Sequence, residues 1–210
     1  MRAAIVSLVG ILVGLGGAPI SASTEPLREY YESVSSLQGT FKQVTRDEQG
    51  QVVKRSKGQF SLKRPDRFHW FYETPFKQRL VSNGKWLYSH DVELLQVTIR
   101  PIEEVLGVGP AVVLSGDFQD LQASFRIREG EDGWYRLEPR DEDWQFQSVR
   151  LRLREGVPAT VEVSDGLGQT MRLSLDELER NVSIPAERFR FEIPDDADVI
   201  APDAFERRSR

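Results

Sequence analysis

The chain has 210 residues, with 28 Lys or Arg against 33 Asp or Glu, so its formal net charge at neutral pH is −5. This slightly acidic balance disfavours a nucleic-acid partner, which would require a basic face. Cysteine is absent, which excludes disulfides, thiolate metal sites and lipid attachment through a cysteine. The two histidines, His69 and His90, do not have metal-ligand spacing, and no catalytic or cofactor motif is found. We therefore expect a protein that is not an enzyme and holds no metal or cofactor.

Residues 1–22 have the pattern of a cleaved secretory signal. Arg2 gives a basic start, and the apolar run Ile5–Leu15 is shorter than the ~20 residues that a spanning helix needs. Small residues follow, so we expect cleavage after Ala22 or Ser23. An uncleaved anchor is the less favoured alternative. The remaining residues, 23–210, are enough for one exported, soluble domain with a substantial core.

The chain after this signal begins with helical spacing and then alternates with period two. Residues 25–36 predict an amphipathic helix, because Leu27, Tyr30 and Tyr31 fall on one face. Turn signals such as Asn83-Gly84 separate the later segments. The predicted strands are Thr40–Arg46, Val52–Lys63, Arg67–Glu73, Gln78–Val81, Lys85–His90, Leu94–Ile99, Ala123–Arg128, Tyr135–Pro139, Phe146–Arg154, Thr160–Ser164 and Thr170–Leu175. A helical turn near Pro185–Glu187 then leads into Phe189–Ile193.

Residues 101–122 interrupt the strands with helix signals. Pro101 and Pro110 stand at first helical positions, and Gly107, Gly109 and Gly116 divide the segment. This pattern predicts two or three short helices joined at flexible points. Together these elements predict a single-domain α+β fold, an unclosed antiparallel barrel or sandwich of about eleven strands with an N-terminal helix.

Aromatic and aliphatic side chains gather on one face of the predicted strands. Alternation places Phe60 and Leu62 on the same face as Phe68, Trp70 and Tyr72, and the pattern repeats at Trp86 and Tyr88. Such a face fills an ordinary core, or it lines an apolar cavity that short glycine-hinged helices cover as a movable lid. From composition alone the two interpretations are equally favoured.

The segments that carry these residues resemble the LolA family of outer-membrane lipoprotein carrier proteins. The resemblance rests on Gly58–Trp70 and Gln78–Tyr88, with further matches at Phe41–Gln43, Pro110–Leu114 and Arg188–Phe191. They keep a consistent order over nearly the whole chain after the signal. The resemblance implies an unclosed β-barrel with a helical lid over an apolar cavity.

The resemblance also implies a function and its residues. A member of this family takes acylated lipoproteins from an inner-membrane ABC release complex, crosses the periplasm as a monomer and delivers them to an outer-membrane receptor lipoprotein. Arg64 matches the family arginine that holds the lid shut through main-chain carbonyls, and Phe68 matches a position linked to transfer. We expect the acyl-chain cavity to be lined by Phe60, Leu62, Phe68, Trp70, Tyr72, Trp86 and Tyr88, and the lid to contain Val105, Leu106, Pro110, Val112, Val113 and Leu114.

Two other functions fit the same fold. A soluble periplasmic carrier of free glycolipid or phospholipid would use the same cavity, because apolar contacts do not distinguish the acyl chains of these lipids from those of a lipoprotein. A lipid-sensing regulator would need a dedicated protein partner.

Overall fold

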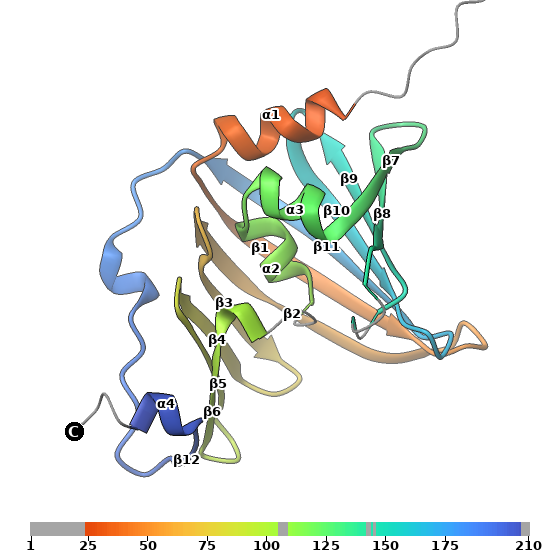
Figure 1. The fold of residues 1–210 in the computed structure, drawn as a ribbon. Helices are drawn as coiled ribbons and strands as arrows, with labels where there is room; N and C mark the ends of the chain where they lie inside the picture. The colour runs from red at the N-terminus through yellow and green to blue at the C-terminus, as the bar shows by residue number, and fades with distance from the viewer. Residues whose placement is uncertain (1–23, 105–108, 142–143, 145, 207–210) are drawn as a thin grey trace, which may run out of the picture.

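The computed structural model describes residues 24–104, 109–141, 144 and 146–206. These residues form one large curved sheet with short helices (Figure 1). The helices are α1 (Glu25–Ser33), η1 (Ile102–Glu104), α2 (Gly109–Ser115), α3 (Phe118–Ser124), η2 (Ala186–Phe189) and α4 (Asp203–Glu206). The strands are β1 (Ser36–Arg46), β2 (Val52–Lys63), β3 (Arg67–Thr74), β4 (Gln78–Asn83), β5 (Trp86–Asp91), β6 (Gln96–Pro101), β7 (Phe125–Glu129), β8 (Trp134–Pro139), β9 (Ser148–Arg154), β10 (Val157–Ser164), β11 (Thr170–Arg180) and β12 (Asp198–Ile200). None of the helices in these ranges is long and apolar enough to cross a membrane.

The described strands join edge to edge in the order β12-β6-β5-β4-β3-β2-β1-β11-β10-β9-β8-β7. The long strand β1 pairs with both β2 and β11, so it connects the first half of the chain to the second. The two end strands, β7 and β12, are not neighbours in this order, so the sheet curves without closing (Figure 1). The expected α+β class and unclosed barrel are therefore confirmed.

The predicted helix over residues 25–36 is shorter in the structure and ends at Ser33. The reason lies in β1, which already begins at Ser36. The Ser36 hydroxyl donates a hydrogen bond to the carbonyl oxygen of Val182 at 2.7 Å. This contact with a distant segment holds Ser36 in the sheet and prevents the helix from continuing.

The C-terminal segment contains a strand that is not among the predicted ones. Residues 190–193 follow η2 without forming a strand, and β12 appears further on. β12 pairs with β6 in parallel, with Asp198 opposite Gln96 and Ile200 opposite Thr98. The sheet is therefore mixed rather than fully antiparallel.

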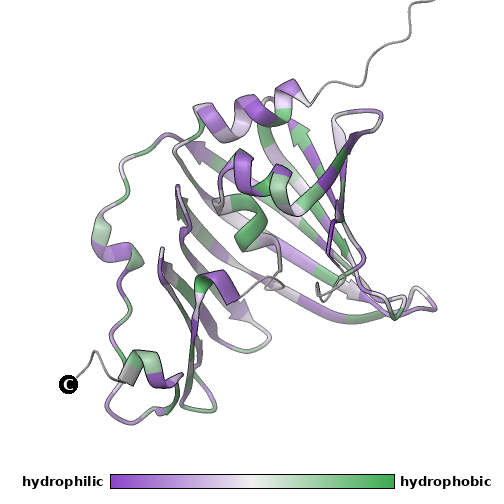
Figure 2. Ribbon diagram, viewed as in Figure 1, coloured by the Kyte–Doolittle hydropathy of each residue, from purple (hydrophilic) through white to green (hydrophobic). Residues whose placement is uncertain are grey.

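The main core lies on the inner face of the sheet, defined here as the face that α1, α2 and α3 cover (Figure 1). Apolar and polar residues alternate along the strands, as Figure 2 shows, so each strand points one set of side chains inward. The Phe60 and Trp70 rings stack with their centroids 4.8 Å apart, and Phe41 lies 4.9 Å from Trp70. Ring pairs at these distances stabilise the core beyond their buried area.

A second apolar cluster lies on the outer face of β4, β5 and β6, and the C-terminal segment covers it. The Tyr88 ring stacks on Phe191 at 5.2 Å, and the Trp86 ring meets Phe205 edge-on at 5.3 Å. The expected placement of Trp86 and Tyr88 beside Phe60 is therefore wrong.

Strand pairing explains this correction. Phe68 of β3 lies opposite Ser82 of β4, and Ser82 lies opposite Leu87 of β5. Residues that lie opposite each other share a face of the sheet, so Leu87 is on the inner face with Phe68. Tyr88 lies opposite Val81 and takes the other face. Alternation within β5 does not reveal which of its two faces points inward, because a shift of one residue exchanges them.

Gly58 allows β2 to approach β3 closely at a point where their pairing shifts by one residue. A Cβ atom at this position would lie 1.8 Å from the carbonyl oxygen of Phe71 and 3.0 Å from Cε1 of Phe41. A distance of 1.8 Å to a backbone atom cannot be relieved by turning a side chain.

We predict that Gly58→Ala lowers the free energy of unfolding by about 2–3 kcal/mol, because the backbone of β2 or β3 must shift. Urea unfolding measures this change. Gly166→Ala is the matched control, since a Cβ there meets nothing within 4 Å. Equal stability of the two variants would show that this close approach is not a constraint.

Candidate functional site

Two short helices, α2 and α3, lie over the inner face of the sheet (Figure 1), and we call them the cover helices. With η1 they agree with the two or three short helices expected over residues 101–122. Among the expected lid residues, Pro110, Val113 and Leu114 are buried and Val112 is half-buried. Val105 and Leu106 lie outside the described residues. The described part of α2 contacts β2, β3 and β10.

The C-terminal end of α2 is hydrogen-bonded by groups from other parts of the chain. A helix leaves its last carbonyl groups without partners from its own backbone. Here each successive carbonyl from Val113 to Gly116 accepts a hydrogen bond from outside the helix. The bonds run from Tyr31 Oη to Val113 O (2.6 Å), from Tyr30 Oη to Leu114 O (3.3 Å), from Asp66 N to Ser115 O (3.1 Å) and from Arg64 Nη1 to Gly116 O.

Arg64 connects this helix end to α1. Its Nε donates a hydrogen bond to the carbonyl oxygen of Val34 at 2.9 Å, while Nη1 donates to Gly116. The guanidinium carbon lies 4.7 Å from the Tyr30 ring centre and 4.3 Å from the Tyr31 ring centre. Contacts of a cation with aromatic rings at this range are attractive, more so where water is excluded. Arg64 therefore holds α1 and the end of α2 to the same point.

The two tyrosine hydroxyls remain protonated at any physiological pH. Burial raises the pKa of Tyr30 to about 12 and raises the pKa of Tyr31 as well, despite the nearby Arg64 charge, which favours the ionised forms. Each hydroxyl therefore stays a hydrogen-bond donor to α2. Helical spacing predicts both tyrosines on the apolar face of a helix but not this role, because their partners lie more than 80 residues away in the chain.

The apolar surface beneath the cover helices contains most of the expected cavity residues. Phe60, Leu62, Phe68 and Trp70 are at most 2% exposed, and all four belong to the same packed cluster as α2. Tyr72 is half-buried at the margin of this cluster, and its hydroxyl donates a hydrogen bond to Oε1 of Gln43 at 3.1 Å. The structure thus brings these five side chains together, whereas Trp86 and Tyr88 lie on the outer face.

A pocket of about 220 Å³ extends the inner face beyond this cluster, on β4, β5 and β6. Leu80 and Leu87 form its apolar side and also pack against the main core. The sequence pattern does not predict this pocket, because it places Trp86 and Tyr88 instead of Leu87 on the inner face of β5. The remaining lining residues are Ser89, Thr98 and Arg100.

Comparison with known proteins agrees with this arrangement. A family model described as outer membrane lipoprotein carrier protein LolA matches residues 32–192. An outer-membrane lipoprotein carrier protein of Halorhodospira halophila is 44% identical over 202 residues, which are 96% of this chain and 96% of the relative. A protein of the same name from Alkalilimnicola ehrlichii is 41% identical over 204 residues, which are 95% of each chain.

Solved structures share the fold at low sequence identity. A conserved protein from Thermus thermophilus superimposes with a TM-score of 0.53 at 16% identity, covering 85% of this chain and 98% of the other. A LolA superfamily protein from Nitrosomonas europaea gives a TM-score of 0.51 at 14% identity, covering 81% and 99%. At these identities the likeness extends to the fold alone.

We predict that Tyr31→Phe loosens α2 without unfolding the protein. The phenylalanine ring keeps the packing, but the Val113 carbonyl loses its donor, and an unsatisfied buried carbonyl costs about 1–3 kcal/mol. Amide hydrogen exchange in residues 111–116 should accelerate roughly tenfold.

The control is Tyr135→Phe, which removes a hydroxyl from the same core without a hydrogen bond to the described part of α2. Exchange in α2 should be unchanged in this variant. Equal acceleration in both variants would indicate general softening of the core instead of a specific effect at Val113.

Proposed function

Because the chain belongs to the LolA family of outer-membrane lipoprotein carrier proteins, we propose that it binds the acyl chains of lipoproteins and carries them to the outer membrane. The activity is binding and release, with no covalent step. The support from the structure is that two short helices cover a large apolar surface and are held there by a few side-chain hydrogen bonds.

The proposed place of action is the periplasm. Residues 1–22 serve as the export signal, and residues 23–210 form the carrier domain. The cargo comes from an inner-membrane ABC release complex and goes to an outer-membrane receptor lipoprotein. The carrier works as a monomer, because its apolar surface is covered within a single chain.

Acyl chains bind where the cover helices now lie. Each methylene group that leaves water contributes about 0.8 kcal/mol, so an acyl chain offsets the apolar contacts that α2 and α3 give up. Phe60, Leu62, Trp70 and Tyr72 form the surface that receives the chains. Phe68 belongs to the same surface, and because Phe60, Leu62, Phe68 and Trp70 are all buried in the closed state, they reach cargo only after the cover helices move.

Arg64 is the latch of this lid. Its bonds to Val34 and Gly116 join α1 to the end of α2, and they must break when α2 moves away from the sheet. Hydrogen bonds to a charged donor contribute about 1.5–3 kcal/mol each. Their re-formation favours the closed state and therefore helps to expel the cargo at the receptor.

We predict that Arg64→Leu still takes up lipoprotein but transfers it poorly. Loss of the latch removes part of the free energy that closes the lid, so the cargo-bound state becomes more populated. The measurement uses spheroplasts that make a labelled outer-membrane lipoprotein, incubated with residues 23–210. Release into the soluble fraction and transfer to outer membranes are then quantified separately, with transfer expected to fall by at least about tenfold.

Lys63→Leu is the matched control, because it removes the neighbouring positive charge without removing a bond to the described part of α2. This variant should release and transfer cargo as the wild type does. Normal transfer by Arg64→Leu would refute the latch. If the wild type releases no lipoprotein from competent spheroplasts but copurifies with phospholipid or glycolipid, the protein is a free-lipid carrier instead.

A further inference from the structure

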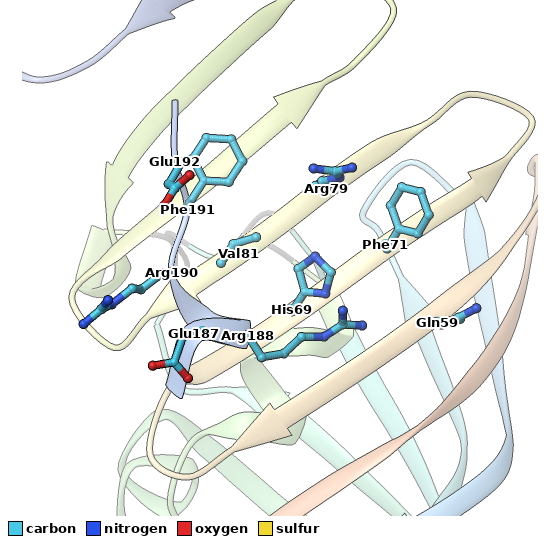
Figure 3. Close-up of a pocket in the computed structure, with 10 residues that line it drawn as sticks. All are labelled: Gln59, His69, Phe71, Arg79, Val81, Glu187, Arg188, Arg190, Phe191 and Glu192. Atoms are coloured by element: carbon cyan, nitrogen blue, oxygen red, sulfur yellow. The ribbon is translucent and has the colours of Figure 1, made fainter. Parts of the chain in front are cut away.

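A groove of about 650 Å³ lies on the outer face of the sheet, away from the cover helices (Figure 3). Residues of β2, β3 and β4 form its floor, and the chain from η2 onward, residues 187–192, forms the facing wall. The groove lies on the opposite face of the sheet from the acyl-chain surface, so it is a separate site from the one proposed above.

Two arginines approach the same histidine in this groove. Figure 3 shows Arg79 from β4 and Arg188 from η2 on two sides of His69, while Glu187 points away from it. Arg79 also lies over the Phe71 ring, with its guanidinium carbon 5.5 Å from the ring centre. Neither arginine forms an ion pair within the described ranges.

His69 is half-buried at the floor of this groove. Its Nδ1 atom is shielded from solvent and has no hydrogen-bond partner among the residues that the structure describes. Burial, together with the charges of Arg188 and Arg79, lowers the pKa of His69 to about 4. The imidazole is therefore neutral at neutral pH, and a neutral imidazole still donates one hydrogen bond.

Arg79, Arg188 and His69 line the same part of the groove, and the Glu187 carboxylate points away from them (Figure 3). Guanidinium groups bind phosphate oxygens with a matching fork of N–H donors, and two of them from different elements surround a tetrahedral anion well. The other charged residues that line the groove are Glu187, Arg190 and Glu192. The volume falls within the range of small-molecule sites and exceeds what a bare phosphate needs.

We propose that this groove binds a phosphate group carried on a small polar molecule, with the phosphate between Arg79 and Arg188 and beside His69. The phosphate bridges β4 and η2, so it fastens the C-terminal segment to the sheet. Phe71 and Val81 supply an apolar floor for the carbon atoms attached to the phosphate.

The test is titration of residues 23–210 with inorganic phosphate, with glycerol 3-phosphate and with dihexanoyl-phosphatidylglycerol. The chain has two histidines, so the imidazole NMR signals of His69 and His90 are readily separated. We expect a saturable shift of the His69 signal at millimolar ligand or below. The pKa of His69 should rise by roughly one unit or more, because an anion stabilises the charged imidazole.

Variants locate the site. Arg79→Gln and Arg188→Gln should each weaken binding by at least about tenfold, since each removes a charged donor to the phosphate. Arg190→Gln is the matched control, because Arg190 lines the groove but points away from His69 (Figure 3). Its affinity should stay close to that of the wild type.

The probes also distinguish the source of the phosphate. Tighter binding of glycerol 3-phosphate than of inorganic phosphate supports a small phosphorylated molecule as the ligand, and still tighter binding of dihexanoyl-phosphatidylglycerol identifies a lipid headgroup as its source. Equal binding of all three probes would overturn the role of the attached carbon atoms. Absence of a saturable His69 shift with all three probes would overturn the proposal. Unchanged binding in both Arg79→Gln and Arg188→Gln would overturn it as well.

Discussion

The arrangement of this protein depends on how the C-terminal carbonyls of α2 find hydrogen-bond donors. A helix of seven residues has little stability of its own in water, so its place on the sheet is set by tertiary contacts. Those contacts are two tyrosine hydroxyls from α1, and the Arg64 guanidinium and the Asp66 amide from the turn between β2 and β3. The same few bonds therefore decide both where α2 lies and whether the inner face is covered.

These directional bonds and the apolar contacts below them have different roles. The rings of Phe60, Phe68 and Trp70 gain stability from any apolar neighbour, because burial of apolar surface is not directional. The carbonyls of α2 need donors at defined positions. An acyl chain can thus substitute for the apolar contacts of the cover helices but not for their hydrogen bonds. The closed state therefore has hydrogen bonds to the α2 carbonyls that the cargo-bound state lacks.

The sequence predicted the sheet well where alternation and turn residues agree, as for β2, whose bounds match, and for the hairpin at Asn83-Gly84. It failed where pairing with a distant strand decides the outcome. Alternation predicts Trp86 and Tyr88 on the inner face, yet the pairing of β5 with β4 directs Leu87 inward. The three residues of β12 give too short a pattern to recognise. Arg64 was identified through family resemblance, whereas Tyr30 and Tyr31 could not be connected to α2, since nothing local reveals a contact over such a separation.

An unclosed barrel leaves two sheet edges whose backbone groups can pair with another molecule, and exposed edges are a common route to aggregation. The two edges of this sheet are protected differently. The parallel strand β12 occupies the edge of β6, and at the other end the exposed side chains of Arg126 and Arg128 project from β7. Charged residues on an edge strand oppose edge-to-edge association. The sheet can consequently remain unclosed while the chain resists polymerising with copies of itself.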